Sequence, residues 1–199
     1  MTSICLIRHG ETDWNKKGIL QGTKDTPLNS NGIIQAHQCS EFLKNSQWDI
    51  LATSPLQRAK QTAQIINNNH NIPLIEVKKF MERHYGDAEG MTVEERNTKF
   101  PDQKYRDQET WTDLQERSME GLYELHERFT NQKILLVSHG AVINAILATL
   151  SNGEIGTGKT VLRNTCMNHL HFHGKWSIEQ YNVVSHLSQY NDQENIVHY

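Results

Sequence analysis

The sequence predicts an α/β fold with a mixed, mostly parallel sheet. Two short apolar runs, at residues 4–7 and 134–137, have the length and continuity of strands buried on both faces. Segments with helical caps and helical periodicity alternate with the predicted strands, as in parallel sheets joined by crossovers. Residues 164–173 and 177–184 predict two antiparallel strands around Gly174-Lys175, so the sheet is expected to be mixed.

The first part of the chain predicts three strands and two helices. Asn29 or Ser30 is expected to cap the first helix. Ser54-Pro55 is expected to cap the second, with proline at the first helical position. In order, we expect a strand at 4–7, a polar loop at 11–27, a helix at about 30–44, a strand at 49–53, a helix at about 56–67 and a strand at 74–77.

The second part of the chain predicts three helices and three strands. Thr92 and Glu95 form a capping box for a short helix, and Thr112 with Gln115 is expected to cap the next one. In order, we expect helices at 93–100 and about 113–129, a strand at 134–137, a helix at 141–150, and the two antiparallel strands.

Composition indicates one globular domain, expected at residues 1–187, followed by a polar tail at 188–199. The net charge is −3, from 20 basic and 23 acidic residues spread along the chain, which argues against nucleic-acid or membrane partners. Three cysteines without CxxC spacing favour a reducing compartment, and no apolar run has membrane-spanning length. We therefore expect a cytoplasmic protein, monomeric or weakly dimeric.

Two predicted strands each end at a histidine–glycine pair, with His9 after the first and His139 after the later one. Ligands of open α/β sheets bind beyond the carboxyl ends of the strands. Phosphoryl transfer to histidine needs a neutral imidazole, an anion clamp and an acid for the leaving oxygen. Arg8 favours the neutral form of His9, and Arg58 lies in the first turn of a predicted helix, where it can face the same anion.

Five blocks of the sequence, in order, resemble the histidine phosphatase superfamily, whose members are phosphoglycerate-mutase-like. The resemblance covers about residues 1–150. The blocks are Arg8-His9-Gly10-Glu11-Thr12 with Trp14-Asn15 and Gln21-Gly22; Pro27-Leu28 with Gly32 and Gln35-Ala36; Thr53-Ser54-Pro55-Leu56 with Arg58-Ala59 and Thr62-Ala63; Glu82-Arg83-His84-Tyr85-Gly86; and Val137-Ser138-His139-Gly140.

The resemblance implies a three-layer α/β/α sandwich and a site that needs neither a metal nor another cofactor. It implies His9 as the nucleophile, Glu82 as the general acid, and a phosphate clamp in which Arg8 and Arg58 act with His139. Such a cationic cluster is expected to bind phosphate or sulfate. The further residues implied in binding a small phosphorylated metabolite are Asn15, Gln21, Gly22, Arg83, Tyr85, Gly140 and Ala141.

Two members of the superfamily fit the sequence, a broad-specificity phosphatase and a 2,3-bisphosphoglycerate-dependent phosphoglycerate mutase. The block that begins at Glu82 resembles the mutases. However, the chain lacks their long basic insertion between this block and His139, and Gln21 and Ala141 stand where mutases have threonine and asparagine. We therefore expect a phosphatase, with the mutase as the alternative and a non-catalytic phospho-ligand binding module as a more remote one.

The substrate is expected to be selected by a cover at about residues 87–111. Tyr105, Arg106 and Trp111 are candidate contacts in this segment. These residue types do not choose among phosphoglycerates, sugar phosphates and nucleotides.

Two other patterns compete with this interpretation. Residues 153–160 match the phosphate-loop pattern GxxxxGKT, but that motif requires a strand before it and a helix after it, and neither is predicted here. His169, His171 and His173 alternate along a predicted strand, a stripe that is more often a polar strand face than a metal site.

Overall fold

The computed structural model describes residues 1–187, so the predicted tail at 188–199 lies outside the described part. Its six-stranded sheet has the order β3-β2-β4-β1-β5-β6. The four strands β1 to β4 run parallel, and β5 is antiparallel to both of its neighbours, β1 and β6, which confirms the mixed, mostly parallel sheet. The strands are β1 (Thr2–Arg8), β2 (Ile50–Thr53), β3 (Leu74–Glu76), β4 (Lys133–Ser138), β5 (Met167–Phe172) and β6 (Trp176–Val183).

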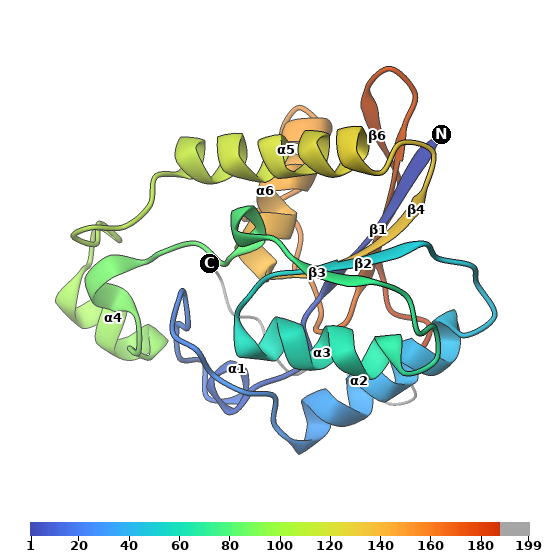
Figure 1. Ribbon diagram of the computed structural model, residues 1–199. Coiled ribbons are helices and arrows are strands. Elements are labelled where there is room, and N and C mark those ends of the chain that lie inside the picture. The colour runs from blue at the N-terminus through green and yellow to red at the C-terminus, as the bar shows by residue number, and fades with distance from the viewer. Residues whose placement is uncertain (188–199) are drawn as a thin grey trace.

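Helices cover both faces of the sheet, as a three-layer sandwich requires. Figure 1 shows α5 and α6 on one face and α2 and α3 on the other. The side chains of β1 alternate between the layers, with Ile4 and Leu6 in one apolar cluster and Cys5 and Ile7 in the other. The helices are α1 (Asp13–Lys16), α2 (Ser30–Leu43), α3 (Gln57–Asn67), α4 (Val93–Lys99), α5 (Trp111–Arg128) and α6 (Gly140–Leu150), with 3₁₀ turns η1 (Lys78–Phe80) and η2 (Gly86–Ala88).

Two of the predicted helix caps are correct. The side chain of Asn29 accepts a hydrogen bond from the Gly32 amide at the start of α2. Thr92 and Glu95 form the predicted capping box of α4. In both cases the cap directly precedes the helix and depends on local sequence alone.

The other two caps are wrong. Leu56, and not Ser54, is the N-cap of α3, and it makes no side-chain capping bond. Proline is therefore outside the helix, and Ser54 is left for a long-range contact. At α5, Thr110 caps in place of Thr112, with its side chain accepting from the Asp113 amide, so the helix begins two residues earlier than predicted.

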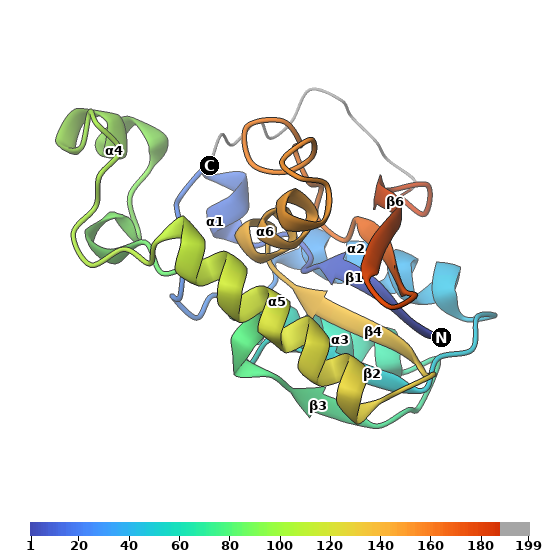
Figure 2. The same cartoon turned by 90° about the horizontal axis from the view of Figure 1, so that it is seen from above.

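The strands that carry the two histidines are neighbours at the centre of the sheet. β1 pairs with β4 in parallel register, with Arg8 opposite Ser138. Both strands therefore end at the same edge, and His9 and His139 emerge side by side. The first loop, predicted to be irregular, contains the short helix α1 at this edge. Residues 87–111 include α4, which Figure 2 shows projecting beyond α1 and away from the sheet.

The phosphate-loop pattern lacks the flanking elements that it requires, and His171 of the histidine stripe contacts protein groups. Residues 153–160 connect α6 to β5, so no strand precedes them and no helix follows. The ring of His171 contacts Ser3 Oγ at 2.9 Å and Glu179 Oε2 at 2.5 Å, and His173 lies beyond the end of β5. No helix within residues 1–187 has the length and apolarity needed to cross a membrane.

Candidate active site

The two strand-end histidines lie side by side at the carboxyl edge of the sheet, with their rings tilted by 56°. The ring centroids of His9 and His139 are 5.2 Å apart, and both side chains are buried. His139 is the N-cap of α6, while His9 follows β1 directly. The parallel register of β1 and β4 thus places two imidazoles next to each other that are far apart in the sequence.

One hydrogen bond orients the His9 ring and identifies its tautomer. Nδ1 lies 2.7 Å from the Gly10 carbonyl oxygen. Because a carbonyl can only accept, Nδ1 carries the proton and donates it. In the neutral ring the lone pair is therefore on Nε2, the nitrogen at the other side of the imidazole.

His139 is held by Ser54, the residue that precedes α3 by three positions. Its Nε2 atom lies 2.7 Å from Ser54 Oγ, and both residues are completely buried. The same hydroxyl accepts from the Leu56 amide at 3.3 Å. A serine expected to cap a helix thus connects β2 to the second histidine.

Two buried arginines surround the histidines, and backbone carbonyls hold them. Arg58 donates to the carbonyls of Gly22 and Lys24, at 2.8 Å each. Arg8 donates from one terminal nitrogen to the Leu162 carbonyl at 2.5 Å. Since carbonyls carry no formal charge, these bonds orient the guanidinium groups and leave their positive charge in the site.

Burial and the arginines together hold both imidazoles in the neutral form. For His9, burial is the main cause of a pKa well below the usual histidine value, with smaller contributions from Arg58 and Arg8. For His139, burial again comes first, followed by the positive charge of Arg58, and its pKa is also well below the usual value. Both rings are therefore uncharged at neutral pH.

The first loop brings its predicted residues to the site and ties them to one another. Asn15 accepts from the backbone and side chain of Thr12, at 3.1 Å each, in a capping box of α1. Gln21 accepts from Thr12 Oγ1 at 2.9 Å and from Thr26. Because the amide oxygens of Asn15 and Gln21 already accept these bonds, each residue can use its amide nitrogen to donate to an anion.

Gly22 and Gly10 are positions where only glycine fits. Gly22 has a φ of +53°, and a Cβ there would lie 2.0 Å from Glu89 Oε1. A Cβ on Gly10 would lie 2.5 Å from the Gly32 carbonyl oxygen, because the chain after His9 touches the N-terminal turn of α2. Glycine thus allows the close approach of Glu89 and of the Gly32 backbone at these two positions.

Glu82 reaches the site from the segment after η1. Its Oε2 atom accepts from the Ala141 amide at 3.3 Å, and its Oε1 atom from the Arg83 amide at 2.9 Å. Ala141 is the second residue of α6, two positions after His139. The buried carboxylate therefore lies at the helix terminus that also presents the second histidine.

The other residues predicted to bind substrate have different surroundings. The guanidinium of Arg83 lies over the rings of Tyr85 and Trp111, at 5.3 and 5.9 Å from their centroids. Tyr105 is buried and bonded to Arg96 at 3.4 Å, whereas Arg106 is exposed and pairs with Asp87 at 3.3 Å. Gly140, the first residue of α6, packs against Arg8.

The family model of the histidine phosphatase superfamily (branch 1) matches residues 4–184 of this chain. The chain belongs to the histidine phosphatase superfamily.

Relatives of this histidine phosphatase support the phosphatase side of the superfamily. It is 47% identical over 189 residues to "Uncharacterized phosphatase PhoE" of Bacillus subtilis (strain 168), covering 94% of this chain and 98% of the relative. It is 33% identical over 203 residues to "Metal-independent phosphoserine phosphatase" of Arabidopsis thaliana, covering 94% and 84%. The expected phosphoric monoester hydrolase is confirmed at the level of this superfamily.

A solved structure gives the same result for the fold. The phosphoserine phosphatase of Entamoeba histolytica, solved in complex with 3-phosphoglyceric acid, superposes with a TM-score of 0.83 at 32% identity. The match covers 94% of this chain and 99% of that one. The expected phosphoglycerate-mutase-like fold is therefore confirmed.

Several residues that build the site of this histidine phosphatase escaped the sequence analysis. Ser54 was expected only as a cap, and Asn164, which donates to the His9 carbonyl at 2.9 Å, gave no signal. Arg117 did give a sequence signal, because it lies between Leu114 and Gly121 on the buried face of α5. A charged residue on an apolar helix face is a sign of a buried polar network.

The described side chains of this histidine phosphatase do not form a cluster of metal ligands. Within residues 1–187, no group of three or more His, Cys, Asp or Glu could hold a metal ion.

Proposed function

We propose that this protein is a phosphomonoesterase that hydrolyses small phosphorylated metabolites through a phosphohistidine intermediate on His9. The observation that carries the proposal is the bond between His9 Nδ1 and the Gly10 carbonyl, which leaves the lone pair on Nε2 of a buried, neutral ring. A neutral imidazole with a fixed orientation is the form that can attack phosphorus.

In the first step, His9 Nε2 attacks the phosphorus atom of the substrate, and the bond between phosphorus and the leaving oxygen breaks. Glu82 donates its proton to that oxygen, which departs as an alcohol. In the second step, the Glu82 carboxylate takes a proton from water, whose oxygen attacks the phosphohistidine. The P–N bond breaks, inorganic phosphate forms, and His9 and protonated Glu82 are regenerated.

The clamp stabilises the phosphoryl oxygens during both steps. Arg8 and Arg58 supply fixed positive charge, oriented by their bonds to carbonyl oxygens. His139 accepts a proton when the phosphate dianion binds beside it and then donates to a phosphoryl oxygen. The amide groups of Asn15 and Gln21 and the backbone near Gly22 add neutral donors from the first loop.

The position of Glu82 supports its role as the acid. Its carboxylate is fixed by the backbone amides of Arg83 and Ala141, and Ala141 lies two positions after His139.

Residues 87–111 are proposed as the cover that selects the leaving group. Their α4 segment projects past the site edge (Figure 2), and its backbone bonds to the first loop through Leu20 and Met91 at 3.0 Å. Arg83 and Tyr85 lie at its base. Relatives named for phosphoserine, and a neighbour solved with 3-phosphoglyceric acid, support small phosphorylated acids as first substrates to try.

The reaction is proposed to need no metal and no other cofactor, consistent with the description of the Arabidopsis relative as metal-independent. 2,3-bisphosphoglycerate would be required only by the mutase alternative. Activity in the presence of a chelator is the expected result. We also propose that the protein acts in the cytoplasm, as a monomer or a weak dimer.

A panel of phosphomonoesters tests the proposal. It should contain phosphoserine, sugar phosphates, nucleotides, and 3-phosphoglycerate with and without 2,3-bisphosphoglycerate. We expect inorganic phosphate from one or more of these. Isomer formation without phosphate release would identify a mutase, and phosphate-ester binding without turnover would identify a binding module. The variant His9→Asn is assayed on the same panel, and His37→Asn, on the exposed side of α2, is its matched control.

A further inference from the structure

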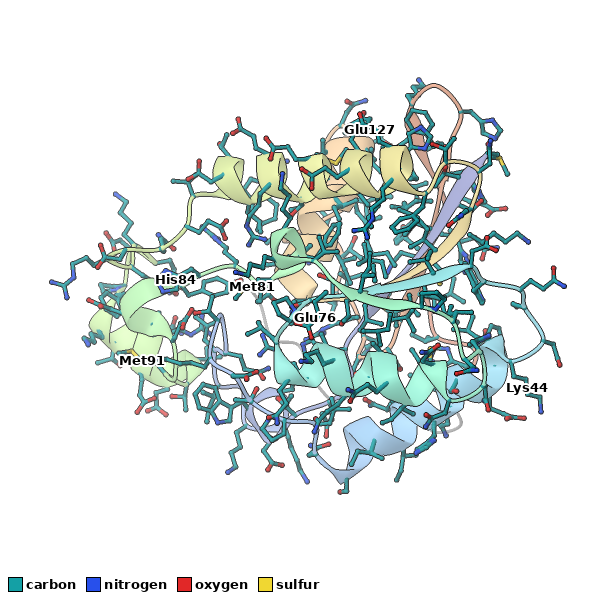
Figure 3. All side chains as sticks on the ribbon, in the orientation of Figure 1. Lys44, Glu76, Met81, His84, Met91 and Glu127 are labelled. Carbon is teal, nitrogen blue, oxygen red and sulfur yellow. The ribbon has the colours of Figure 1, made fainter. Side chains whose placement is uncertain are left out.

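A cluster of bonds away from the reacting atoms holds the segment that carries Glu82. The segment comprises residues 79–84, from the last residues of η1 to shortly before η2, and Figure 3 labels Met81 and His84 on it. It has no regular secondary structure beyond η1, so the position of Glu82 depends on what holds its backbone. Two residues, Arg117 on α5 and Glu109 just before it, supply most of these bonds.

Arg117 binds three carbonyls of the segment with its two terminal nitrogens. One donates to the carbonyls of Lys79 and Met81, at 2.6 and 2.8 Å, and the other to the carbonyl of Glu82 at 3.4 Å. The planar guanidinium presents its donors in a rigid fork, so it fixes the direction of these carbonyls as well as their distance.

Glu109 completes the arrangement by binding both the arginine and the segment. Its carboxylate accepts from Arg117 Nε at 2.5 Å and from a terminal nitrogen at 2.9 Å. Its backbone accepts from the Arg83 side chain at 2.9 and 2.8 Å, and its amide donates to the His84 carbonyl at 2.8 Å. The Arg117 and Glu109 side chains are only 23% and 16% exposed, so water competes weakly with this bidentate pair.

We propose that Arg117 and Glu109 are positioning residues that set the location of the Glu82 carboxylate for proton donation to the leaving oxygen. The inference rests on the proposed acid role of Glu82. Among the described contacts, the side chains of Arg117 and Glu109 bond only to residues 79–84 and to each other. The charge of Arg117 reaches the clamp only as the smallest of the contributions that lower the pKa of His139. Their loss should therefore impair protonation of the leaving group and leave attack by His9 largely intact.

The leaving group of the substrate separates these two effects. An alkyl leaving group, as in phosphoserine, needs a proton from the acid, whereas 2,4-dinitrophenolate departs without one. For Arg117→Gln we expect a loss of about 10²-fold in kcat/KM with phosphoserine, and a loss of no more than about threefold with 2,4-dinitrophenyl phosphate. The activated substrate also verifies, in the same sample, that the variant is folded.

Other variants serve as controls and as a second route to the result. Glu109→Ala should reproduce the leaving-group dependence, and Glu109→Gln, which keeps an acceptor for Arg117, should recover part of the loss. These two variants carry the test if Arg117→Gln does not fold. Glu120→Gln removes an exposed charge on the same helix, which pairs only with the Lys79 side chain among the described contacts, and should behave like the wild type.

A double variant gives the decisive comparison. Glu82→Gln should show a larger loss with the same leaving-group dependence, and adding Arg117→Gln to it should cost little more, because two changes that remove one function are not additive. If Glu82→Gln lowers the activity on both substrates equally, the acid role fails and the inference fails with it. If Glu82→Gln shows the dependence and Arg117→Gln does not, only the inference is overturned.

Discussion

At the scale of single residues, the site combines two buried arginines with two imidazoles that burial keeps neutral. The pKa of each histidine lies well below its usual value before an anion binds. A phosphate dianion beside the rings has the opposite effect, because a negative charge favours the protonated imidazole. The proton on His139 is therefore expected to arrive with the ligand.

Phosphate binding should take up about one proton at pH 7.5, where inorganic phosphate is already mostly a dianion. Isothermal titration in buffers of different ionisation enthalpy measures this number directly. Since the bound state holds more protons, the affinity should also weaken as pH rises above neutrality. Binding whose enthalpy does not depend on the buffer would contradict the assigned protonation of the histidines.

At the scale of elements, the sequence predicted the strands and helices well and some of their ends poorly. The caps at Asn29 and Thr92 act on amides within three residues, and such local signals are readable from the sequence. For α5, the sequence predicted Thr112 as the cap, whereas Thr110 is the cap in the structure. The choice of Thr110 depends on how the preceding loop, anchored by Glu109, meets the segment with Glu82.

This difference predicts unequal effects of two similar substitutions. Thr110→Ala removes the side-chain acceptor for the Asp113 amide and should lower the free energy of unfolding by about 1 kcal/mol. Thr112→Ala, on the exposed side of the first turn, should change it by less than about 0.5 kcal/mol. Urea denaturation of both variants checks the prediction. Equal losses, or a larger loss for Thr112→Ala, would place the cap where the sequence suggested.

At the scale of the whole molecule, long-range contacts account for what the sequence left unpredicted. His9 and His139 could be matched because both follow apolar strands, and general rules put strand ends at a binding edge. The bond from Ser54 to His139 and the contacts of Arg117 with residues 79–82 join distant segments. Such contacts depend on strand order and helix placement, which one sequence does not specify.

The buried histidines also make folding stability depend on pH. Folding depresses the pKa of His9 and His139, and burial lowers that of His186 to about 4. Below about pH 6.5 the unfolded chain binds protons that the folded protein does not, so the free energy of unfolding must fall as pH decreases. This stability is fully present above pH 6.5 and is lost as pH approaches the folded-state values.

Each fully buried histidine should contribute a slope of up to about 1.4 kcal/mol per pH unit below pH 6.5. Urea denaturation at pH 7.5, 6.5 and 5.5 measures the effect. The double variant His9→Asn and His139→Asn should show a shallower decrease than the wild type, whereas His37→Asn should not. A stability that rises toward pH 5.5 would mean that the two rings are charged in the folded protein.

The most direct test of the whole account is to trap the phosphorylated enzyme. The protein is mixed with a ³²P-labelled phosphomonoester that it hydrolyses, quenched in alkali, digested and mapped. We predict a label on His9 that is stable in base and labile in acid. It should be present in His37→Asn and absent from His9→Asn. A label on any other residue, or one that persists in His9→Asn, would contradict it.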